Sequence, residues 1–415
     1  MFITNIFLQL IITVSIILIL MSRKYYMGLC MLAGGIILWL MRSGDPFLLA
    51  TSFVSMLHQT RTYDLIISLY LIMCMEILLR SSGTLANMVN ALKKAFSSDK
   101  AIIAIMPFFL GVLPSVGGAR FSCPIVEESS RQYNASQEDK AAINYWFRHP
   151  CELFNPIVPG MIMACSISGV AYSEFLKGTF WICIVWLILG WILLIQPLKK
   201  IDTAESVEDK AADTSEPEAK TSLVDVFLAI MPIFITFLLV VFLDLNASIA
   251  MILSTSLLYI ILLLRKAEIS LKDAILGAID KKMFINIGFI LYFVQILEDT
   301  GALSDVVAAF QAAPLPTPVI IAGITFVVAI LTGMSQAYIA IVMPISAALS
   351  QSGDMLLLII TMVFGLAGLM LTPIHVCFTV TTDYFNASFF KVLYKIMLMI
   401  GIILAIFSGY QYWIA

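Results

Sequence analysis

The residues of this chain that could do chemistry are short polar groups at places where long apolar stretches are interrupted. Four interruptions occur: PSVGG at 114–118, NPIVPG at 155–160, TGMSQ at 332–336 and TPI at 372–374. Glycine permits left-handed backbone and close approach to a ligand, while Ser, Thr, Asn and Gln provide short polar ligands. These segments supply the candidate binding residues Ser115, Gly117, Gly118, Asn155, Thr332, Gly333, Ser335, Gln336 and Thr372.

The chemistry expected at such breaks is the binding of small ions and anionic groups. Half-helix N-termini favour anions, and carbonyl groups at the C-terminal ends of half-helices suit Na⁺. The backbone at Gly117 and Gly118 indicates a small anionic solute, with Arg120 adding positive potential and Na⁺ as a candidate ion at 114–118 and 332–336. A single Gly or Pro is more typical of a helix kink. Four interruptions at corresponding places favour a binding site.

A second set of residues is ionisable and lies at or near membrane depth, where such groups are functional candidates. This set comprises Glu127, Glu128, His149, Glu152, His375 and Asp383. The function expected of it is ion or proton coupling. The two glutamates have an alternative, a solvated position at a cytoplasmic mouth, paired with Arg120 or Arg131. The histidines have one too, because a lone buried histidine is more often a hydrogen-bonded structural residue than a proton carrier.

The elements that position these residues are membrane-spanning helices. Of the 415 residues, 61% are hydrophobic and only 12% are charged, against about 45–50% and about 25% in soluble domains. The apolar runs have the length of about twenty residues that a helix needs to cross about 30 Å of hydrocarbon. We therefore expect an all-α polytopic membrane protein.

Other functions are disfavoured by the composition and by the motifs. A net charge of −3 without a basic cluster argues against nucleic-acid binding. The sequence contains no HExxH, GxSxG or Walker motif, so neither an enzyme nor an ATP-driven pump is expected. The seven cysteines stand singly and form no CxxC, which predicts neither a disulfide framework nor a zinc site. No cofactor is expected beyond Na⁺ or H⁺ as a coupling ion.

The apolar windows predict five crossings in each half of the chain. The first half contains spans at 2–21, 25–41, 63–79, 138–172 (broken) and 175–196. The second half contains spans at 223–243, 245–264, 283–297, 354–386 (broken) and 388–410. The stretches 101–132 and 317–350 are too long for one crossing and are interrupted midway, which predicts re-entrant hairpins. The polar, charge-rich segment 199–222 is typical of a flexible linker.

The two halves share a sequence repeat. A shift of 218 residues gives eleven identities in the 37 positions from 83 to 119, without a gap. The repeat includes amphipathic stretches at 83–97 and 301–313, each expected to lie along the membrane surface as an arm. The chain thus divides into a first repeat at 1–198, the linker, and a second repeat at 223–415.

The distribution of basic residues tests this layout. With five crossings per half the second repeat is inverted, and 21 of the 24 Lys and Arg residues then lie on one side of the membrane. That side is expected to be cytoplasmic and to contain the linker, with both termini extracytoplasmic and the protein in the cell (inner) membrane.

One motif carries a resemblance to a known family. PSVGGARFSCPIVEESS, at 114–130, resembles the GGA-x-F-S-x-P-x-V-E-E stretch of the uncharacterised membrane family called domain of unknown function 401. That family is placed in the ion-transporter superfamily, with divalent-anion/sodium symporters, gluconate permeases, arsenite permeases and a group of sodium/proton antiporters. In the dicarboxylate members Ser-Asn-Thr occupies both hairpin tips, whereas this chain has Ser115-Val116-Gly117 and Gly333-Met334-Ser335 there.

The resemblance implies an inverted-repeat fold that works as an elevator. Scaffold spans at 2–79 and 223–297 would form a homodimer, and transport regions at 101–196 and 317–410 would move against them, joined by the arms. The function expected is ion-coupled secondary active transport of a small, anionic solute. The alternative is a cation/proton (Na⁺/H⁺) antiporter that uses Glu127, Glu128, Asp383 and the histidines. A membrane scaffold or lipid-handling protein is a third class, disfavoured because it needs no symmetric helix breaks.

Overall fold

The protein is described by a computed structural model over residues 5–95, 98–112, 118–201, 223–350 and 354–414. The described part is helical, with one isolated bridge between Tyr133 and Lys200 and no strand. The helices of the first half are α1 Ile6–Ser22, α2 Met27–Arg42, α3 Pro46–His58, α4 Thr60–Ser81, α5 Thr84–Ala95, α6 Asp99–Val112, α7 Gly118–Ser129, α8 Gln137–Arg148, η1 Pro150–Leu153, α9 Pro159–Ser168, α10 Tyr172–Gly190 and η2 Trp191–Ile195. Those of the second half are α11 Leu223–Phe242, α12 Ala247–Leu264, α13 Leu271–Gly277, α14 Lys281–Asp299, α15 Ala302–Gln311, α16 Thr317–Thr332, α17 Ser335–Leu349, α18 Leu356–Met370, α19 Val376–Tyr384 and α20 Phe389–Ile414.

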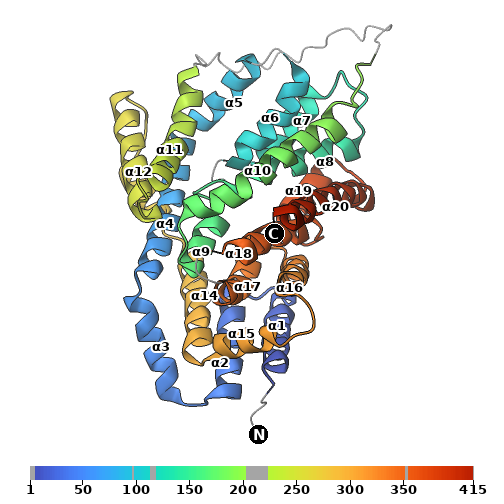
Figure 1. Cartoon of the computed structure of the whole chain (residues 1–415). Coiled ribbons are helices and arrows are strands. Elements are labelled where there is room, and N and C mark those ends of the chain that lie inside the picture. The colour runs from blue at the N-terminus through green and yellow to red at the C-terminus, as the bar shows by residue number, and fades with distance from the viewer. Residues whose placement is uncertain (1–4, 96–97, 113–117, 202–222, 351–353, 415) are drawn as a thin grey trace.

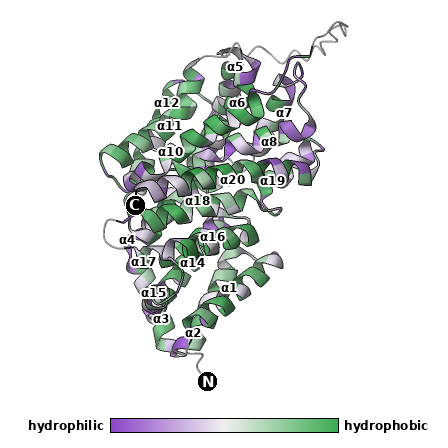
Figure 2. Ribbon diagram, turned by 45° about the vertical axis from the view of Figure 1, so that its right-hand side comes forward, coloured by the Kyte–Doolittle hydropathy of each residue, from purple (hydrophilic) through white to green (hydrophobic). Residues whose placement is uncertain are grey.

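Several helices are long and apolar enough to cross a membrane. By length and composition these are α4, α10 with η2, α11, α12 and α20, and a sixth if the bent pair of α14 and α15 is counted as one span. Large apolar side chains on these helices face outward, including Leu264 and Phe390, each 78% exposed. Figure 2 shows hydrophobic residues along most helices, with hydrophilic residues gathered toward α5 and the α7–α8 end. The described part of the chain is therefore helical, and its apolar helices are compatible with a multi-pass membrane protein.

The predicted elements and the observed helices differ mainly in where the chain breaks. The stretch 101–132 contains most of α6 and all of α7, and 317–350 contains α16 and α17; the two helices of each stretch pack on each other. Two short helices, α3 and α13, occupy segments to which the sequence assigned no element. Within the linker, Ile201 donates from its backbone N–H to Gln132 O, so its first residues run beside the loop after α7. Residues 202–222 lie outside the described part of the chain.

Helices of one half pack against helices of the other half in a reciprocal pattern. α14 packs on α2 and α3, and α4 packs on α12 and α13. In Figure 1, α11 and α12 lie together at one corner and α1, α2 and α15 lie at the opposite end. α16, α17 and α18 pack on one another, as do α6, α7 and α8. α17 also packs on α9, which connects the two groups that carry the helix breaks.

The helices α5 and α15 are each preceded by a glycine with left-handed backbone. Gly83 precedes α5 with φ +71°, and Gly301 precedes α15 with φ +70°. At the second of these glycines the chain bends by 68° between α14 and α15. Left-handed backbone costs other residues free energy but costs glycine little. The sharp turn from α4 or α14 into the following helix therefore depends on these two residues.

Candidate functional site

Two of the sequence-selected residues hold the helix breaks against the hairpin pairs. Asn155 is buried and donates from Nδ2 to Val112 O at the end of α6, at 2.6 Å. Thr372 is also buried and donates from Oγ1 to Ile330 O in the last turn of α16, at 2.6 Å. Both carbonyls belong to helix ends, where the last four C=O groups have no partner within the helix. The two breaks thus satisfy equivalent orphan groups.

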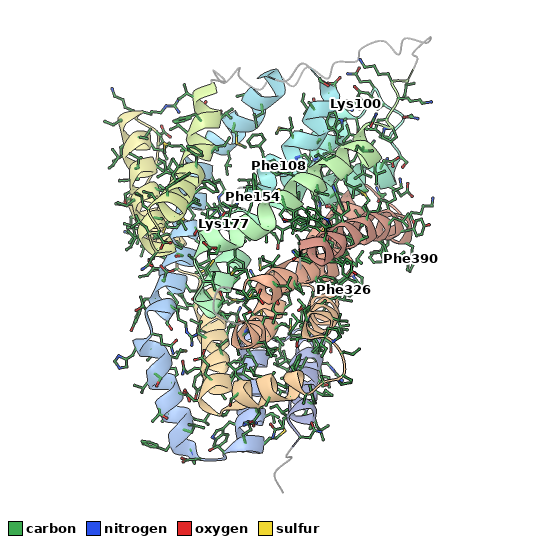
Figure 3. All side chains as sticks on the ribbon, in the orientation of Figure 1. Lys100, Phe108, Phe154, Lys177, Phe326 and Phe390 are labelled. Carbon is green, nitrogen blue, oxygen red and sulfur yellow. The ribbon has the colours of Figure 1, made fainter. Side chains whose placement is uncertain are left out.

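Each of these side chains also binds the backbone of its own break. Asn155 Oδ1 accepts from the N–H of Ile157 at 3.2 Å, and Thr372 Oγ1 accepts from the N–H of Ile374 at 3.4 Å. Such side-chain bonds two residues ahead stabilise turns in competition with helix. They keep the chain unwound between η1 and α9 and between α18 and α19. In Figure 3, Phe108 of α6 lies near Phe154, which precedes the first break, and their rings stack at 6.0 Å.

The break before α19 is joined to the tip between α16 and α17 by a histidine. Gly333 ends α16 in left-handed backbone, with φ +64°, and its carbonyl accepts a hydrogen bond from Nδ1 of His375 at 3.0 Å. His375 is the residue immediately before α19. The left-handed backbone, which glycine adopts at little cost, therefore orients the Gly333 carbonyl toward His375 at the second break.

The structure brings the two distant histidines together. His149, at the end of α8, is buried and donates from Nδ1 to Tyr145 O at 2.7 Å. Its Nε2 lies 3.0 Å from Nε2 of His375. Cys377 of α19 completes a group in which one donor atom from each residue lies within 4.8 Å of the others. Segments separated by more than two hundred residues thus form one cluster.

A cavity of about 260 Å³ opens beside this cluster. His149, Glu152 and Cys377 line it from the broken helices, and Glu76 lines it from α4. The remaining lining residues are Ile72, Met73, Gly111, Val112, Arg148, Cys151, Asn155, Ile157, Val158 and Pro159. The cavity therefore lies between the long helix α4 and the breaks and hairpin of the first half.

Arg148 is the cationic residue in the wall of this cavity. Its Nε and Nη1 atoms are buried, and within the described residues neither has a hydrogen-bond partner. A guanidinium carries five N–H donors in a fixed planar arrangement. Glu152 acts on Arg148 and on His375 through its charge and interacts with the Ser335 hydroxyl of α17. Arg148 therefore presents unused donors at the edge of a space large enough for a small solute.

The other sequence-selected residues lie around this centre or apart from it. Thr332 is buried at the end of α16 and bonds back to Ala329 O, while Ser335 and Gln336 form the start of α17. Glu127 of α7 accepts a hydrogen bond from Tyr384 at 2.9 Å. Glu128 and Asp383 are exposed, and neither lines the cavity.

The first hairpin tip is only partly described. Gly118 is the first residue of α7, whereas Ser115 and Gly117 lie outside the described residues. The binding hypothesis for these two residues, and for Na⁺ at this tip, stays a prediction. The same holds for Na⁺ at the second tip.

Three residues of the site, Arg148, Cys377 and Glu76, are not among the candidates selected from the sequence. For the first two, the sequence contains a signal. Arg148 directly precedes His149 at a helix break, and His375 and Cys377 stand two apart at the other break. Polar and sulfur ligands that flank both breaks could have been grouped as one site.

A second cavity of about 310 Å³ lies between α4, the α11–α12 corner and α9. Arg61 and Asp64 line it, but both already have partners. Arg61 forms an ion pair with Glu298 at 2.8 Å, and Asp64 accepts two hydrogen bonds from Ser248. Arg61 and Asp64 are therefore committed to structure, unlike Arg148.

A comparison with known families shows which family the chain belongs to. The profile of a family described as protein of unknown function (DUF401) matches residues 4–412, which is nearly the whole chain. The protein belongs to this family. No curated protein matches the sequence.

Proposed function

We propose that this protein is an ion-coupled secondary active transporter of a small anionic solute, and that the solute binds in the cavity beside Arg148. The observation that carries the proposal is that Nε and Nη1 of this residue are buried and have no hydrogen-bond partner among the described residues. Buried N–H donors without hydrogen bonds cost free energy, and ionisable residues at membrane depth mark substrate or ion pathways. A carboxylate or another oxyanion matches the planar donors of a guanidinium and would satisfy both.

The charges around the cavity support coupling to a cation. Glu76 and Glu152 line the same cavity as Arg148. An anion bound beside two carboxylates would be repelled unless a co-bound cation offset them. Symport of a cation with the anion meets this condition, because each ion then strengthens the binding of the other. The proposal therefore includes the coupling ion as part of the binding reaction.

The arrangement of the helices supports an inverted repeat. Ten α-helices, α1–α10, are followed in the same order by α11–α20. Gly83 and Gly301 share left-handed backbone and are 218 residues apart, as are the carbonyls of Val112 and Ile330 that the two breaks cap. Inverted repeats with broken helices near the membrane centre are a recurrent transporter architecture. This correspondence extends the sequence repeat to geometry.

The position of the cavity supports an elevator mechanism. One wall is α4, which packs with α12, α13 and α14. The opposite wall is formed by the end of α6, the end of α8 and the break before α9. A solute held at such a boundary would move across the membrane when one group of helices slides against the other. The scaffold would then consist of α1–α4 and α11–α14, with α5 and α15 as arms.

The test is uptake by purified protein in liposomes. A radiolabelled C4 dicarboxylate, inorganic phosphate and sulfate serve as probes under inward Na⁺ or pH gradients. Arg148→Gln removes charge-assisted hydrogen bonds of about 1.5–3 kcal/mol, so it should raise the KM for the transported probe by about 10- to 150-fold. Arg131→Gln is the matched control, because Arg131 is exposed in the loop after α7.

Two results would refute the proposal. One is uptake of no anion by the wild-type protein under either gradient. The other is a KM that Arg148→Gln leaves unchanged or lowers, since removal of a positive charge lowers the KM only for a cationic solute. Monodisperse size-exclusion profiles of each variant show that the comparison is made on folded protein.

A further inference from the structure

The cluster of His149, His375 and Cys377 has the donor set of a metal site. Their ligand atoms lie within 4.8 Å of one another; His149 is buried, and His375 and Cys377 are partly buried. Imidazole nitrogen and thiolate sulfur are the ligands of Zn²⁺ and of other borderline or soft transition metals. Hard cations such as Na⁺ and Mg²⁺ prefer oxygen. The residue types therefore select the class of ion before the geometry is considered.

The hydrogen bonds of the two histidines leave the facing nitrogens free for a metal. Nδ1 of His149 contacts Tyr145 O and Nδ1 of His375 contacts Gly333 O. Because a carbonyl only accepts, each Nδ1 must carry the hydrogen. A neutral ring then has a lone pair on Nε2, and the two Nε2 atoms face each other at 3.0 Å. Two lone pairs at that distance repel, so a positively charged species between them would remove the conflict.

The outer contacts are those of metal-ligating histidines. Such residues donate their second ring N–H to a backbone carbonyl or a carboxylate, which fixes the ring and the tautomer. Both histidines do so here. Cys377 adds a sulfur at the start of α19, two residues after His375. The arrangement therefore supplies three protein ligands with fixed orientation.

We propose that His149, His375 and Cys377 bind one Zn²⁺-like transition-metal ion with a coordination position open to the 260 Å³ cavity. Three protein ligands and one exchangeable position are typical of zinc sites that do more than hold structure. His149 and Cys377 both line the cavity, as does Glu152, whose charge acts on His375. The proposal goes beyond anion transport. It assigns a transition-metal site to a chain whose cysteine spacing predicted none.

The site would connect the two halves of the molecule. His149 directly follows α8 in the first half. In the second half, His375 directly precedes α19 and Cys377 lies in its first turn. The sequence separation of 226 residues between the two histidines explains why spacing rules did not find the site. A bound ion would fix both helix breaks relative to each other.

The test uses Co²⁺ as a spectroscopic probe on the full-length protein, purified in detergent and first treated with a chelator. The expected result is one Co²⁺ per chain, with tetrahedral ligand-field bands and a thiolate-to-cobalt charge-transfer band, both displaced by Zn²⁺. Cys377→Ser should abolish the charge-transfer band and weaken binding at least about tenfold. Cys165→Ser is the matched control, because Cys165 is also a partly buried free cysteine.

Absence of the charge-transfer band in the wild-type protein would overturn the proposal, as would a band that survives Cys377→Ser. In either case the two imidazoles would share a proton instead of a metal. Arg148→Gln separates this proposal from anion transport, because it should abolish high-affinity uptake and leave the cobalt spectrum unchanged. His149→Gln adds a second ligand variant, with size-exclusion chromatography as the folding check.

Discussion

Replacement of Asn155 by alanine tests the role of the first helix break most directly. The side chain is 1% exposed and makes two hydrogen bonds, to Val112 O at 2.6 Å and from the N–H of Ile157 at 3.2 Å. Alanine removes both and leaves a carbonyl and an N–H without partners. Each loss costs about 1–2 kcal/mol, so Asn155→Ala should lower the free energy of unfolding by about 2–4 kcal/mol. This corresponds to a change of about 30- to 700-fold in the unfolding equilibrium.

The assay is equilibrium unfolding by SDS titration in mixed micelles. Asn90→Ala is the control, because Asn90 is exposed on α5 and should change the free energy of unfolding by less than about 0.5 kcal/mol. Thr372→Val removes the equivalent bonds of the second break with little change of shape, and should cost about 1–3 kcal/mol. The reasoning is refuted if Asn155→Ala unfolds at the same SDS concentration as Asn90→Ala.

Two further predictions concern the second hairpin tip and the first turn of α8. Gly333→Ala should destabilise by about 1–3 kcal/mol in the same titration, because φ is +64° and a Cβ would meet Ile374; Gly323→Ala, on an open helix face, should be neutral or slightly stabilising. Burial raises the pKa of Asp139, but its hydrogen bonds with Lys395 and Ser136 and the positive charge of Lys395 together outweigh this effect and leave the pKa below its ordinary value. The ion pair therefore stabilises the fold above the unfolded-state pKa, and the contribution is lost as pH falls through the folded-state pKa. Asp139→Asn should cost about 1 kcal/mol at pH 7 and little at pH 3, and an equal cost at both would contradict this reasoning.

The helical, multi-pass character of the chain was predictable from apolar runs alone. The amphipathic helices α5 and α15 were also predictable, because apolar residues recur every 3.6 residues along any helix that packs one face against an apolar environment. The short helices α3 and α13 were not. Each is too short to give a span signal, and in α3 most side chains are exposed or only partly buried.

The candidate site was partly predictable for a similar reason. Asn155, Thr372 and Gly333 occupy helix breaks, which local chemistry marks through Pro, Gly and short polar side chains. Their partners are carbonyl groups, and every residue carries a carbonyl group. Sequence therefore indicates which side chains cap a helix end, but not which helix end they cap.

The amino-acid sequence was enough to predict a helical chain with long apolar stretches and polar breaks, since composition, period and local turn chemistry are properties of adjacent residues. The three-dimensional packing was needed to show that His149 faces His375 and Cys377, and that Nε and Nη1 of Arg148 lack hydrogen-bond partners among the described residues beside a cavity. These relations join segments that are distant along the chain. They depend on how the broken helices pack, because the low dielectric of the interior makes each unpaired group costly and each pairing specific.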